Sequence, residues 1–229
     1  MDYYLTLLSW GPQGWLDDIG RGVLVTVTLA LATLPIGLAM GFFIALAKQS
    51  EEPTLRTAGN IYTTIFRGMP ELLTLFMVFY GVQIGVQILF PGFNVNSFVA
   101  GMVALAFVFS SYSSEVFLSA FRAIPKGQYE GGYAVGLSYG KTMRLVVLPQ
   151  LIRIALPGLG NLWLILLKDT ALVSAVQLND TLRQAYTASR VTKEPFLFFT
   201  LACLIYLVLA IISSYGFSAI ERKVNQAER

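Results

Sequence analysis

Residues 124–149 read IPKGQYEGGYAVGLSYGKTMRLVVLP and form the longest polar interruption between apolar segments of the chain. The stretch carries Lys126, Lys141 and Arg144 against a single acid, Glu130. Its charge fits an ordinary basic loop on the inner side of a membrane protein. It also fits a docking surface for a soluble partner, held between two membrane spans.

Local signals divide this stretch into a helix and a return to the membrane. Pro125 and Gly127 mark its start, and residues 128–135 are compatible with a short helix. Gly136 suits the first position after a helix C-terminus. Residues 142–148 then turn apolar and lead into the next span.

The composition excludes a soluble domain. The chain has 229 residues, of which only 13% are charged, and a mean hydropathy of +0.65. A pI near 9.0 could indicate a nucleic-acid partner, but the basic residues gather between apolar segments, so we expect no nucleic-acid binding. The sequence has no histidine, and its one cysteine, Cys203, lies in an apolar run. We therefore expect no metal site and no disulfide framework.

The apolar runs predict an all-α membrane protein with five spans, each near the 20 or so residues that a bilayer requires. Residues 1–21 hold two tryptophans beside an acidic pair, which indicates an amphipathic segment at the outer interface. No basic region precedes the first apolar run, so we expect no cleaved signal peptide. The expected spans one, three and five cover residues 22–47, 97–121 and 195–220, and a charged tail covers residues 221–229.

The second apolar segment, residues 55–90, is too long for one straight span. It would extend roughly 50 Å against a hydrocarbon core of about 30 Å. Proline removes a backbone donor and clashes with the preceding turn. Either the start of the segment projects into the cytoplasm or the helix is interrupted. Arg67-Gly68-Met69-Pro70 is the expected position of such a break, with a simple kink at Pro70 as the alternative, and residues 91–94 predict an outer turn.

The fourth span has only a short uncharged run, residues 154–167, before Lys168 and Asp169. The apolar pattern resumes at residues 171–173, so we expect a helix that carries a charged pair at or near membrane depth. Residues 179–194 form a polar outer segment.

The basic residues set the expected orientation. Ten of them fall in segments predicted to be inside and five in segments predicted to be outside, which places the N-terminus outside and the C-terminus and the docking loop in the cytoplasm. The inner group is Lys48, Arg56, Arg122, Lys126, Lys141, Arg144, Arg153, Arg222, Lys223 and Arg229, and the outer group is Arg21, Lys168, Arg183, Arg190 and Lys193.

Charges within the spans are the candidates for function because burying them is costly. If a helix restarts at Pro70, its free N–H groups can hold a carboxylate while Glu71 holds an ammonium group. Alternatively, Glu71 only stabilises the first helical turn. Asp169 can pair with Lys168 or receive the cationic end of a substrate. Glu115 lies nearer the inner side, and we expect it in a helix-packing network with Ser113, Ser114 or Arg122.

No stretch predicts catalysis. Residues 136–142 imitate a phosphate-binding loop, but only three residues separate the glycines and no strand precedes them. We therefore expect this chain not to hydrolyse ATP, so that any ATP-driven transport would need a separate ATPase.

The loop resembles that of bacterial ABC importer permeases, which runs Glu-Ala-Ala, three residues, Gly, nine residues, Ile, one residue, Leu-Pro. Glu130, Gly136, Leu148 and Pro149 match that template, with Val146 in the Ile position. Residues 124–128 resemble the polar amino-acid branch. The chain departs from the template at the alanine positions, which are Gly131 and Gly132 here; each glycine costs a helix roughly 1 kcal/mol.

Two further motifs resemble the same branch. Residues 67–70 resemble its Arg-Gly-x-Pro, and residues 168–172 resemble its Lys-Asp-Thr-Ser-Leu with Ala for Ser. Residues 114–117 resemble Ala-Glu-Ile-Phe, but Leu118 replaces the arginine that usually follows, so that arginine's ion pair is absent or Arg122 replaces it. Nearly the whole chain most resembles the histidine/arginine/opine (octopine/nopaline) permease group.

The resemblance implies a type I, MetI-like importer fold in a single transmembrane permease domain, residues 1–229, with a coupling loop over residues 123–150. It implies alternating access that moves a polar or basic amino acid or an opine across the bacterial inner membrane. The expected ATPase-coupling residues are Gln128, Glu130, Gly131, Gly132, Gly136, Leu148 and Pro149. The expected substrate-binding residues are Arg67, Gly68, Met69, Glu71, Lys168, Asp169 and Thr170.

The resemblance also implies partners: a second permease subunit, expected to be a related but distinct chain, two ATP-binding subunits, a periplasmic substrate-binding protein and the lipid bilayer. This chain would bind no cofactor, because ATP and Mg would be bound by the ATPase. A secondary transporter and a sensory or assembly membrane protein stay open as alternatives, as do the choice of substrate and the choice between homodimer and heterodimer.

Overall fold

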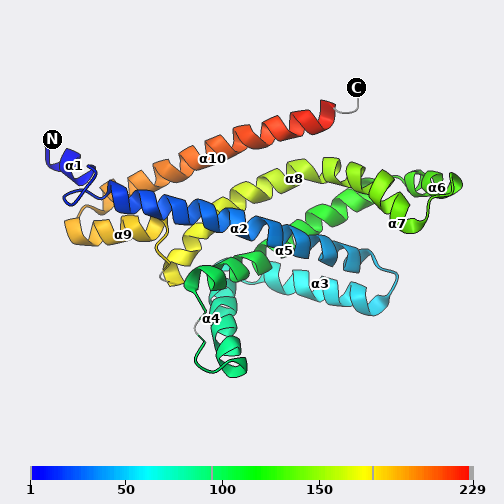
Figure 1. Ribbon diagram of the computed structural model, residues 1–229, viewed down its shortest axis with the longest axis horizontal. Coiled ribbons are helices and arrows are strands. Elements are labelled where there is room, and N and C mark those ends of the chain that lie inside the picture. Colours follow the sequence, from blue (N-terminus) through cyan, green and yellow to red (C-terminus); the bar gives the residue numbers. More distant parts are fainter. Residues whose placement is uncertain (1, 94, 177, 227–229) are drawn as a thin grey trace.

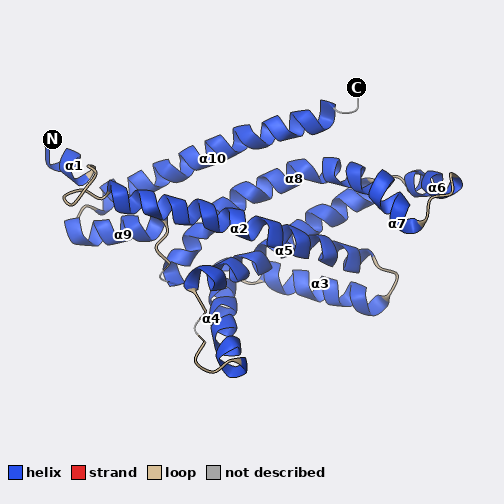
Figure 2. Ribbon diagram, in the orientation of Figure 1, coloured by secondary structure: helices blue, strands red, loops and turns tan. Residues whose placement is uncertain are grey.

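The computed structural model describes residues 2–93, 95–176 and 178–226. All the regular structure in those residues is helical (Figure 2). Five segments are long and apolar enough to cross a membrane, which confirms the predicted fold class: Leu16–Gln49, Glu71–Leu89, Ser97–Ala123, Tyr139–Val176 and Pro195–Val224. In chain order the elements are α1 (Asp2–Leu7), α2 (Leu16–Gln49), α3 (Pro53–Gly68), α4 (Glu71–Leu89), α5 (Ser97–Ala123), α6 (Lys126–Ala134), α7 (Tyr139–Thr142), the π-helix η1 (Met143–Val147), α8 (Leu148–Asp169), the 3-10 helix η2 (Thr170–Val176), α9 (Thr181–Thr192) and α10 (Pro195–Gln226).

The two ends of the molecule carry different elements (Figure 1). Helices α1 and α9 lie at one end, together with the start of α2. Helices α6 and α7 project at the other end, where α3 begins and to which the C-terminal part of α10 extends. The chain therefore begins and finishes at opposite ends of the fold, as an odd number of crossings requires.

Helix α5 is the centre of the fold and packs most closely on α2. Glycines make this approach possible: a Cβ added at Gly37 would lie 2.5 Å from Phe109 Cδ1, and one at Gly41 would lie 2.0 Å from Ser113 Oγ. Small residues at helix contacts are typical of membrane proteins, where tight packing replaces the hydrophobic effect. Ser113 Oγ also donates to Gly37 O at 3.2 Å, which adds a hydrogen bond between the two helices.

The run of serines in α5 is fully buried, and each hydroxyl bonds to a backbone carbonyl. Ser110 donates to Phe107 O at 2.9 Å, and Ser111 donates to Val108 O at 2.7 Å. Ser114 donates in the same way to the carbonyl of Ser111 at 2.8 Å. Because the hydroxyls are satisfied within the helix, this polar cluster interrupts the span in sequence without breaking it in structure.

The second apolar segment breaks, and the alternative of a simple kink at Pro70 is wrong. Helix α3 ends at Gly68, and Met69 and Pro70 take extended backbone angles, with ψ of 149° and 129°. Helix α4 then starts at Glu71 and leaves α3 at a steep angle (Figure 1). The turn that follows is present over residues 90–93, with Gly92 at φ +88°, while Asn94 lies outside the described residues.

Several predicted boundaries are wrong. The first span begins at Leu16 rather than at residue 22, and the helix of the fifth continues beyond residue 220 to Gln226. The fourth is helical from Tyr139, because α7, η1 and α8 are continuous. The π-turn of η1 ends at Val147, two residues before Pro149, which lacks a backbone donor. The polar segment after it contains α9, a helix that the sequence analysis missed.

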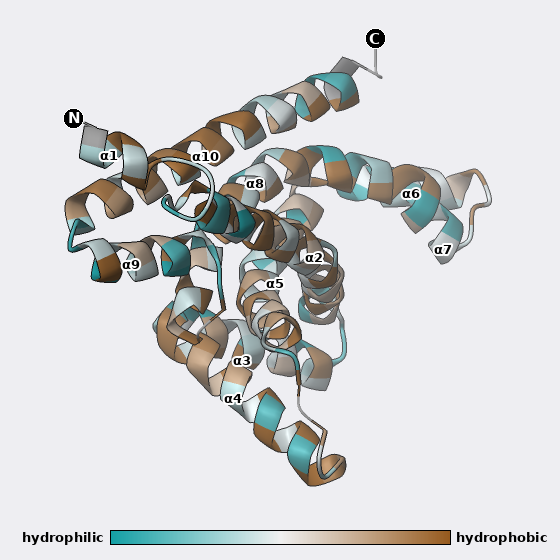
Figure 3. Cartoon of the chain, turned by 60° about the vertical axis from the view of Figure 1, so that its left-hand side comes forward, coloured by the Kyte–Doolittle hydropathy of each residue, from teal (hydrophilic) through white to brown (hydrophobic). Residues whose placement is uncertain are grey.

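Much apolar surface stays exposed on α4 and α10 (Figure 3), although α10 also buries Phe198 and Ala202 against other helices. Met77, Ile84 and Ile88 on α4 are 68%, 59% and 74% exposed. On α10, Phe196 and Ile212 are 84% and 64% exposed. Such surface is stable against lipid tails or another membrane helix, which agrees with the assignment of both as spans.

Candidate functional site

The break between α3 and α4 places a carboxylate at the start of a helix in the middle of the bundle. Glu71 lies in the first turn of α4, where the helix dipole favours a negative charge. Tyr112, on α5, donates its hydroxyl to Glu71 Oε1 at 3.3 Å. Gly68, the last residue of α3, is exposed, and a Cβ there would meet nothing within 4 Å.

Glu71 and Asp169 lie together, although 98 positions separate them in the sequence (169 − 71). Both line one narrow pocket of about 10 Å³, which has room for roughly one water molecule. Two carboxylates among apolar side chains favour a cationic ligand, because a cation offsets the cost of removing them from water. The other lining residues are Leu75, Leu105, Val108, Phe109, Leu166 and Leu172.

Asp169 ends α8, and the chain tightens into the 3-10 helix η2 directly after it. Thr170 is fully buried and donates its hydroxyl to Leu167 O at 2.7 Å. Lys168 is exposed, and no ion pair joins it to Asp169 in the described part of the chain. Asp169 lines the same pocket as Glu71, and its role in receiving the cationic end of a substrate stays a prediction.

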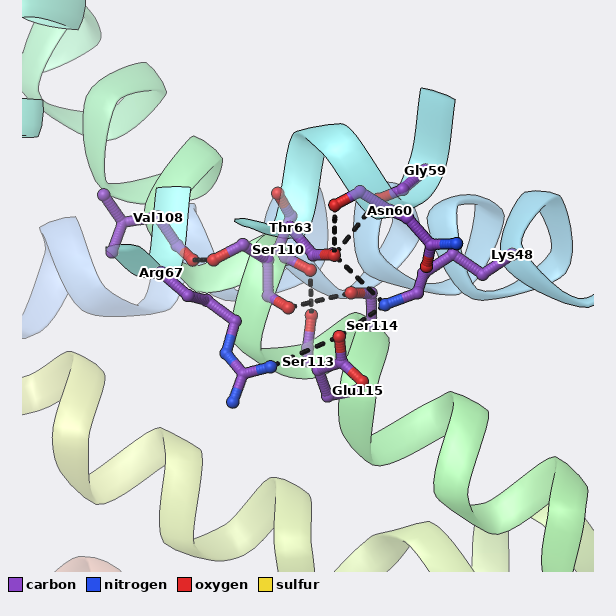
Figure 4. A network of polar contacts seen from close by, with 11 residues as sticks. Lys48, Gly59, Asn60, Thr63, Arg67, Val108, Ser110, Ser113, Ser114 and Glu115 are labelled. Atoms are coloured by element: carbon purple, nitrogen blue, oxygen red, sulfur yellow. Dashed lines mark hydrogen bonds and ion pairs between the residues drawn. The ribbon is translucent and has the colours of Figure 1, made fainter. Parts of the chain in front are cut away.

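Glu115 joins three helices through two ion pairs (Figure 4). Its Oε1 contacts Lys48 Nζ at the end of α2, and Arg67 Nη1 in the last turn of α3 lies 3.2 Å from the same oxygen. Lys48 Nζ also donates to Thr63 Oγ1 at 3.1 Å. The Lys48 side chain is only 5% exposed, so Glu115 neutralises a buried cation.

The partners predicted for Glu115 are therefore wrong. Ser113 and Ser114 bond to backbone carbonyls, as described above, and Arg122 lies exposed near the end of α5. The sequence could not show the true pairing, because Lys48 and Arg67 come from α2 and α3, which reach α5 only in the folded chain.

Arg67 connects this ion-pair cluster to the carboxylate pocket. Its guanidinium lies over the Tyr112 ring, 5.6 Å from the centroid, and Tyr112 in turn bonds to Glu71. An open hollow of about 470 Å³ adjoins the cluster. It is lined by Lys48, Asn60, Thr63, Thr64, Arg67, Gly68, Tyr112 and Glu115.

The projecting end of the molecule is a helical hairpin built from the loop motif. Helix α6 stops at Gly136, whose φ is +82°; Gly136 N–H bonds to Tyr133 O at 2.9 Å and Leu137 N–H to Gly132 O at 3.1 Å. This pattern is a Schellman motif, and it confirms the stop predicted at Gly136. Glu130 is exposed on α6.

A side-chain contact joins α6 to the start of α8. Gln150 Nε2 donates to Gln128 Oε1 at 2.9 Å and to Val146 O at 2.9 Å. Leu148 is the first residue of α8 and Pro149 the second. The residues predicted to couple the chain to an ATPase therefore lie either on this hairpin or in the first turn of α8, the span into which the hairpin leads without interruption.

Comparison with known proteins agrees with this arrangement. Residues 34–226 match the family described as binding-protein-dependent transport system inner membrane component. The chain belongs to this family. It is thus a multi-pass inner-membrane permease component of an ABC importer.

Among relatives, the permease is 38% identical to the nopaline transport system permease protein of Agrobacterium fabrum, over 98% of each chain. It is 37% identical to the arginine ABC transporter permease protein of Escherichia coli, over 90% of this chain and 94% of that one. It is also 36% identical to the histidine/lysine/arginine/ornithine permease protein of Salmonella typhimurium, over 92% and 94%.

Two solved structures extend the likeness to the fold. One is a chain from an amino acid ABC transporter crystallised with histidines, at TM-score 0.78 and 32% identity, covering 91% of the permease and 95% of that chain. The other comes from the inward-facing MetNI methionine ABC transporter, at TM-score 0.74 and 17% identity, covering 91% and 97%. The second likeness shows the fold alone and confirms the MetI-like architecture.

The sequence analysis missed three polar residues that make structural contacts in or near the site. Lys48 closes a charge-free run and looked like an ordinary inner-loop cation, and Tyr112 was hidden in a run of serines. Asp180 accepts from Arg183 N–H at 2.9 Å and Leu182 N–H at 3.3 Å and so caps α9. An acid directly before a helix-compatible run is an N-cap signal that could have revealed it.

Proposed function

We propose that the chain is the transmembrane subunit of an ATP-driven importer that moves a polar or basic amino acid, or an opine, across the bacterial inner membrane by alternating access. The observation that carries the substrate class is the shared pocket of Glu71 and Asp169. Two neighbouring carboxylates at membrane depth, neither in an ion pair within the described residues, suit a substrate with a cationic group. The relatives named for nopaline and arginine transport support the same class.

The break at Pro70 gives the substrate's two ends different partners. Glu71 and Asp169 receive the cationic group, while the free N–H groups at the start of α4 and the guanidinium of Arg67 attract a carboxylate. Around this centre the site includes Gly68, Met69, Lys168 and Thr170. A pocket of about 10 Å³ cannot hold an amino acid, so α4 and α8 must separate for binding. In this proposal, that separation of α4 from α8 is the movement that opens the pocket during alternating access.

The hairpin of α6 and α7 is the proposed contact with the ATPase. An exposed carboxylate, Glu130, and exposed apolar side chains such as Tyr133 (45%) and Val135 (75%) form a surface suited to a soluble partner. The coupling set is Gln128, Glu130, Gly131, Gly132, Gly136, Leu148 and Pro149. ATP and Mg bind to the separate ATPase subunits, and this chain supplies no nucleotide site. The hairpin then lies in the cytoplasm, as does the C-terminus, and the N-terminus lies in the periplasm.

The assembly has two permease subunits, two ATP-binding subunits and a periplasmic substrate-binding protein. The exposed apolar surface of α4 supports a second permease, because that helix stands away from the rest of its own bundle (Figure 1). We infer that this second subunit is a related but distinct chain, as in the group that the sequence resembles.

Uptake by the reconstituted complex tests the proposal. The complex is purified with its ATPase and binding protein, placed in liposomes and supplied with radiolabelled arginine, histidine or octopine. Glu130→Lys should uncouple ATP hydrolysis from uptake while assembly is kept, because it reverses the charge at the ATPase contact. Normal uptake by this variant, or uptake without any ATPase subunit, would refute the proposed coupling.

A further inference from the structure

Two adjacent glycines of α6 have opposite surroundings. Gly132 is buried, and a Cβ added to it would lie 2.5 Å from Thr142 Cγ2, 2.8 Å from Thr142 Oγ1 and 3.1 Å from Thr142 Cβ. Gly131 is exposed, and a Cβ there would meet nothing within 4 Å. The contact with Thr142 therefore explains the absence of a side chain at position 132 and leaves position 131 unconstrained.

The side chain of Thr142 fills space and makes no hydrogen bond within the described residues. It is 1% exposed, and its hydroxyl has no partner in the described part of the chain. A threonine side chain is stiff at χ1 in a helix. Rotation could not remove the contact in any case, because Thr142 Cβ itself would lie 3.1 Å from the added atom.

Gly132 and Thr142 lie where the hairpin turns out of α6 and where α7 continues into the span. The carbonyl of Gly132 accepts the Leu137 N–H that closes the turn out of α6. Thr142 ends α7 and leads directly into the π-helix η1, which continues as α8. The other end of α8 carries Asp169. A shift of α6 toward α7 therefore meets a rigid side chain attached to the span that forms the carboxylate pocket.

We propose that Gly132 and Thr142 are a size-matched pair of positioning residues that transmits the movement of α6 to η1 and α8. The proposal rests on the coupling role proposed above for this hairpin. The absence of a Cβ at position 132 lets the backbone of α6 pack directly on Thr142. The Thr142 side chain fills the space between the two helices, so that α6 cannot move toward α7 without displacing it. Substrate transported per ATP hydrolysed is then sensitive to the combined size of the two side chains.

The test compares matched alanine variants in the reconstituted complex, with uptake and ATP hydrolysis measured together. Gly132→Ala should lower the substrate transported per ATP about five-fold, because the added methyl group overpacks the contact and displaces α6. Gly127→Ala makes the same chemical change at an exposed position of α6 outside the coupling set, where a Cβ would meet nothing within 4 Å, and should behave as wild type. Gly132→Ala combined with Thr142→Ala should recover most of the ratio, since the two nearest atoms, Cγ2 and Oγ1, are gone and only the looser contact with Cβ remains.

Two variants keep the test decisive if Gly132→Ala prevents assembly. Thr142→Ala alone introduces slack without a clash and should lower the ratio about two-fold. Thr142→Val keeps the shape, loses only an unpaired hydroxyl and should match wild type. The inference is overturned if Gly132→Ala equals Gly127→Ala, or if Thr142→Ala alone leaves the ratio unchanged. Glu130→Lys in the same assay distinguishes the coupling role of the hairpin from the role of the Gly132–Thr142 pair. If Glu130→Lys uncouples hydrolysis from uptake while these variants do not, only the proposed pair is refuted.

Discussion

The guanidinium of Arg67 lies 3.2 Å from Glu115 Oε1, which joins the last turn of α3 to the middle of α5. The same oxygen pairs with Lys48, so one carboxylate serves two cations from two other helices. Lys48 is almost fully buried, whereas the Arg67 side chain is 45% exposed. The two cations therefore depend on Glu115 to different extents, and substitutions can separate its structural role from its role near the substrate path.

Glu115→Gln should destabilise the chain by about 3 kcal/mol, because it leaves the Lys48 ammonium buried without a counter-charge. Thermal unfolding of the detergent-solubilised complex measures the loss as a lower Tm. Arg67→Gln is the matched control at the other end of the cluster: its exposed side chain contributes about 1 kcal/mol or less to stability. Equal Tm values for Glu115→Gln and wild type would show that Lys48 does not need this carboxylate.

Gly41→Ala should cost about 1–3 kcal/mol, because its Cβ would lie 2.0 Å from Ser113 Oγ and 3.0 Å from Ser110 O, where α2 meets α5. Gly216→Ala is the control, since a Cβ at that position of α10 would meet nothing within 4 Å and alanine favours a helix. Circular dichroism melts of the two variants in one detergent give the comparison. A larger loss at position 216 would contradict the close α2–α5 contact.

The sequence predicted what depends on local chemistry. The five spans and the helix stop at Gly136 follow from apolar length and a position that tolerates positive φ. The missing backbone donor of Pro70 located the break but left a kink there equally open. The pairing of Lys48 with Glu115 could not be predicted in this way, because it depends on how α2 and α5 pack. The same holds for the meeting of Glu71 with Asp169 and for the fit of Gly132 on Thr142.

Glu71→Gln and Asp169→Asn should each raise the KM for a cationic substrate by about 10–100-fold, because each removes one charge from the shared pocket while keeping its shape. The KM for a neutral polar amino acid should change much less. Uptake kinetics in proteoliposomes with arginine and glutamine measure both. Glu52→Gln, on an exposed acid before α3, is the control and should leave both KM values unchanged. Equal effects on the two substrates would mean that the carboxylates support the structure and do not select charge.

Asp180 should make stability fall as the pH rises through about 6. Burial raises the pKa of its carboxyl from 3.8 to about 6, although hydrogen bonds from the Arg183 and Leu182 amides act to lower it. The folded chain therefore binds an extra proton between these values. The added stability is complete below pH 3.8 and is lost above about pH 6. Between about pH 5 and pH 7.5 the free energy of unfolding should drop by about 1 kcal/mol through this group.

Asp180→Asn keeps an N-cap acceptor but cannot titrate, so its Tm should lose that part of the pH dependence. The test is the Tm of wild type and of Asp180→Asn, each measured at about pH 5 and about pH 7.5. If the Tm of both proteins changes equally between these pH values, the titrating group is not Asp180.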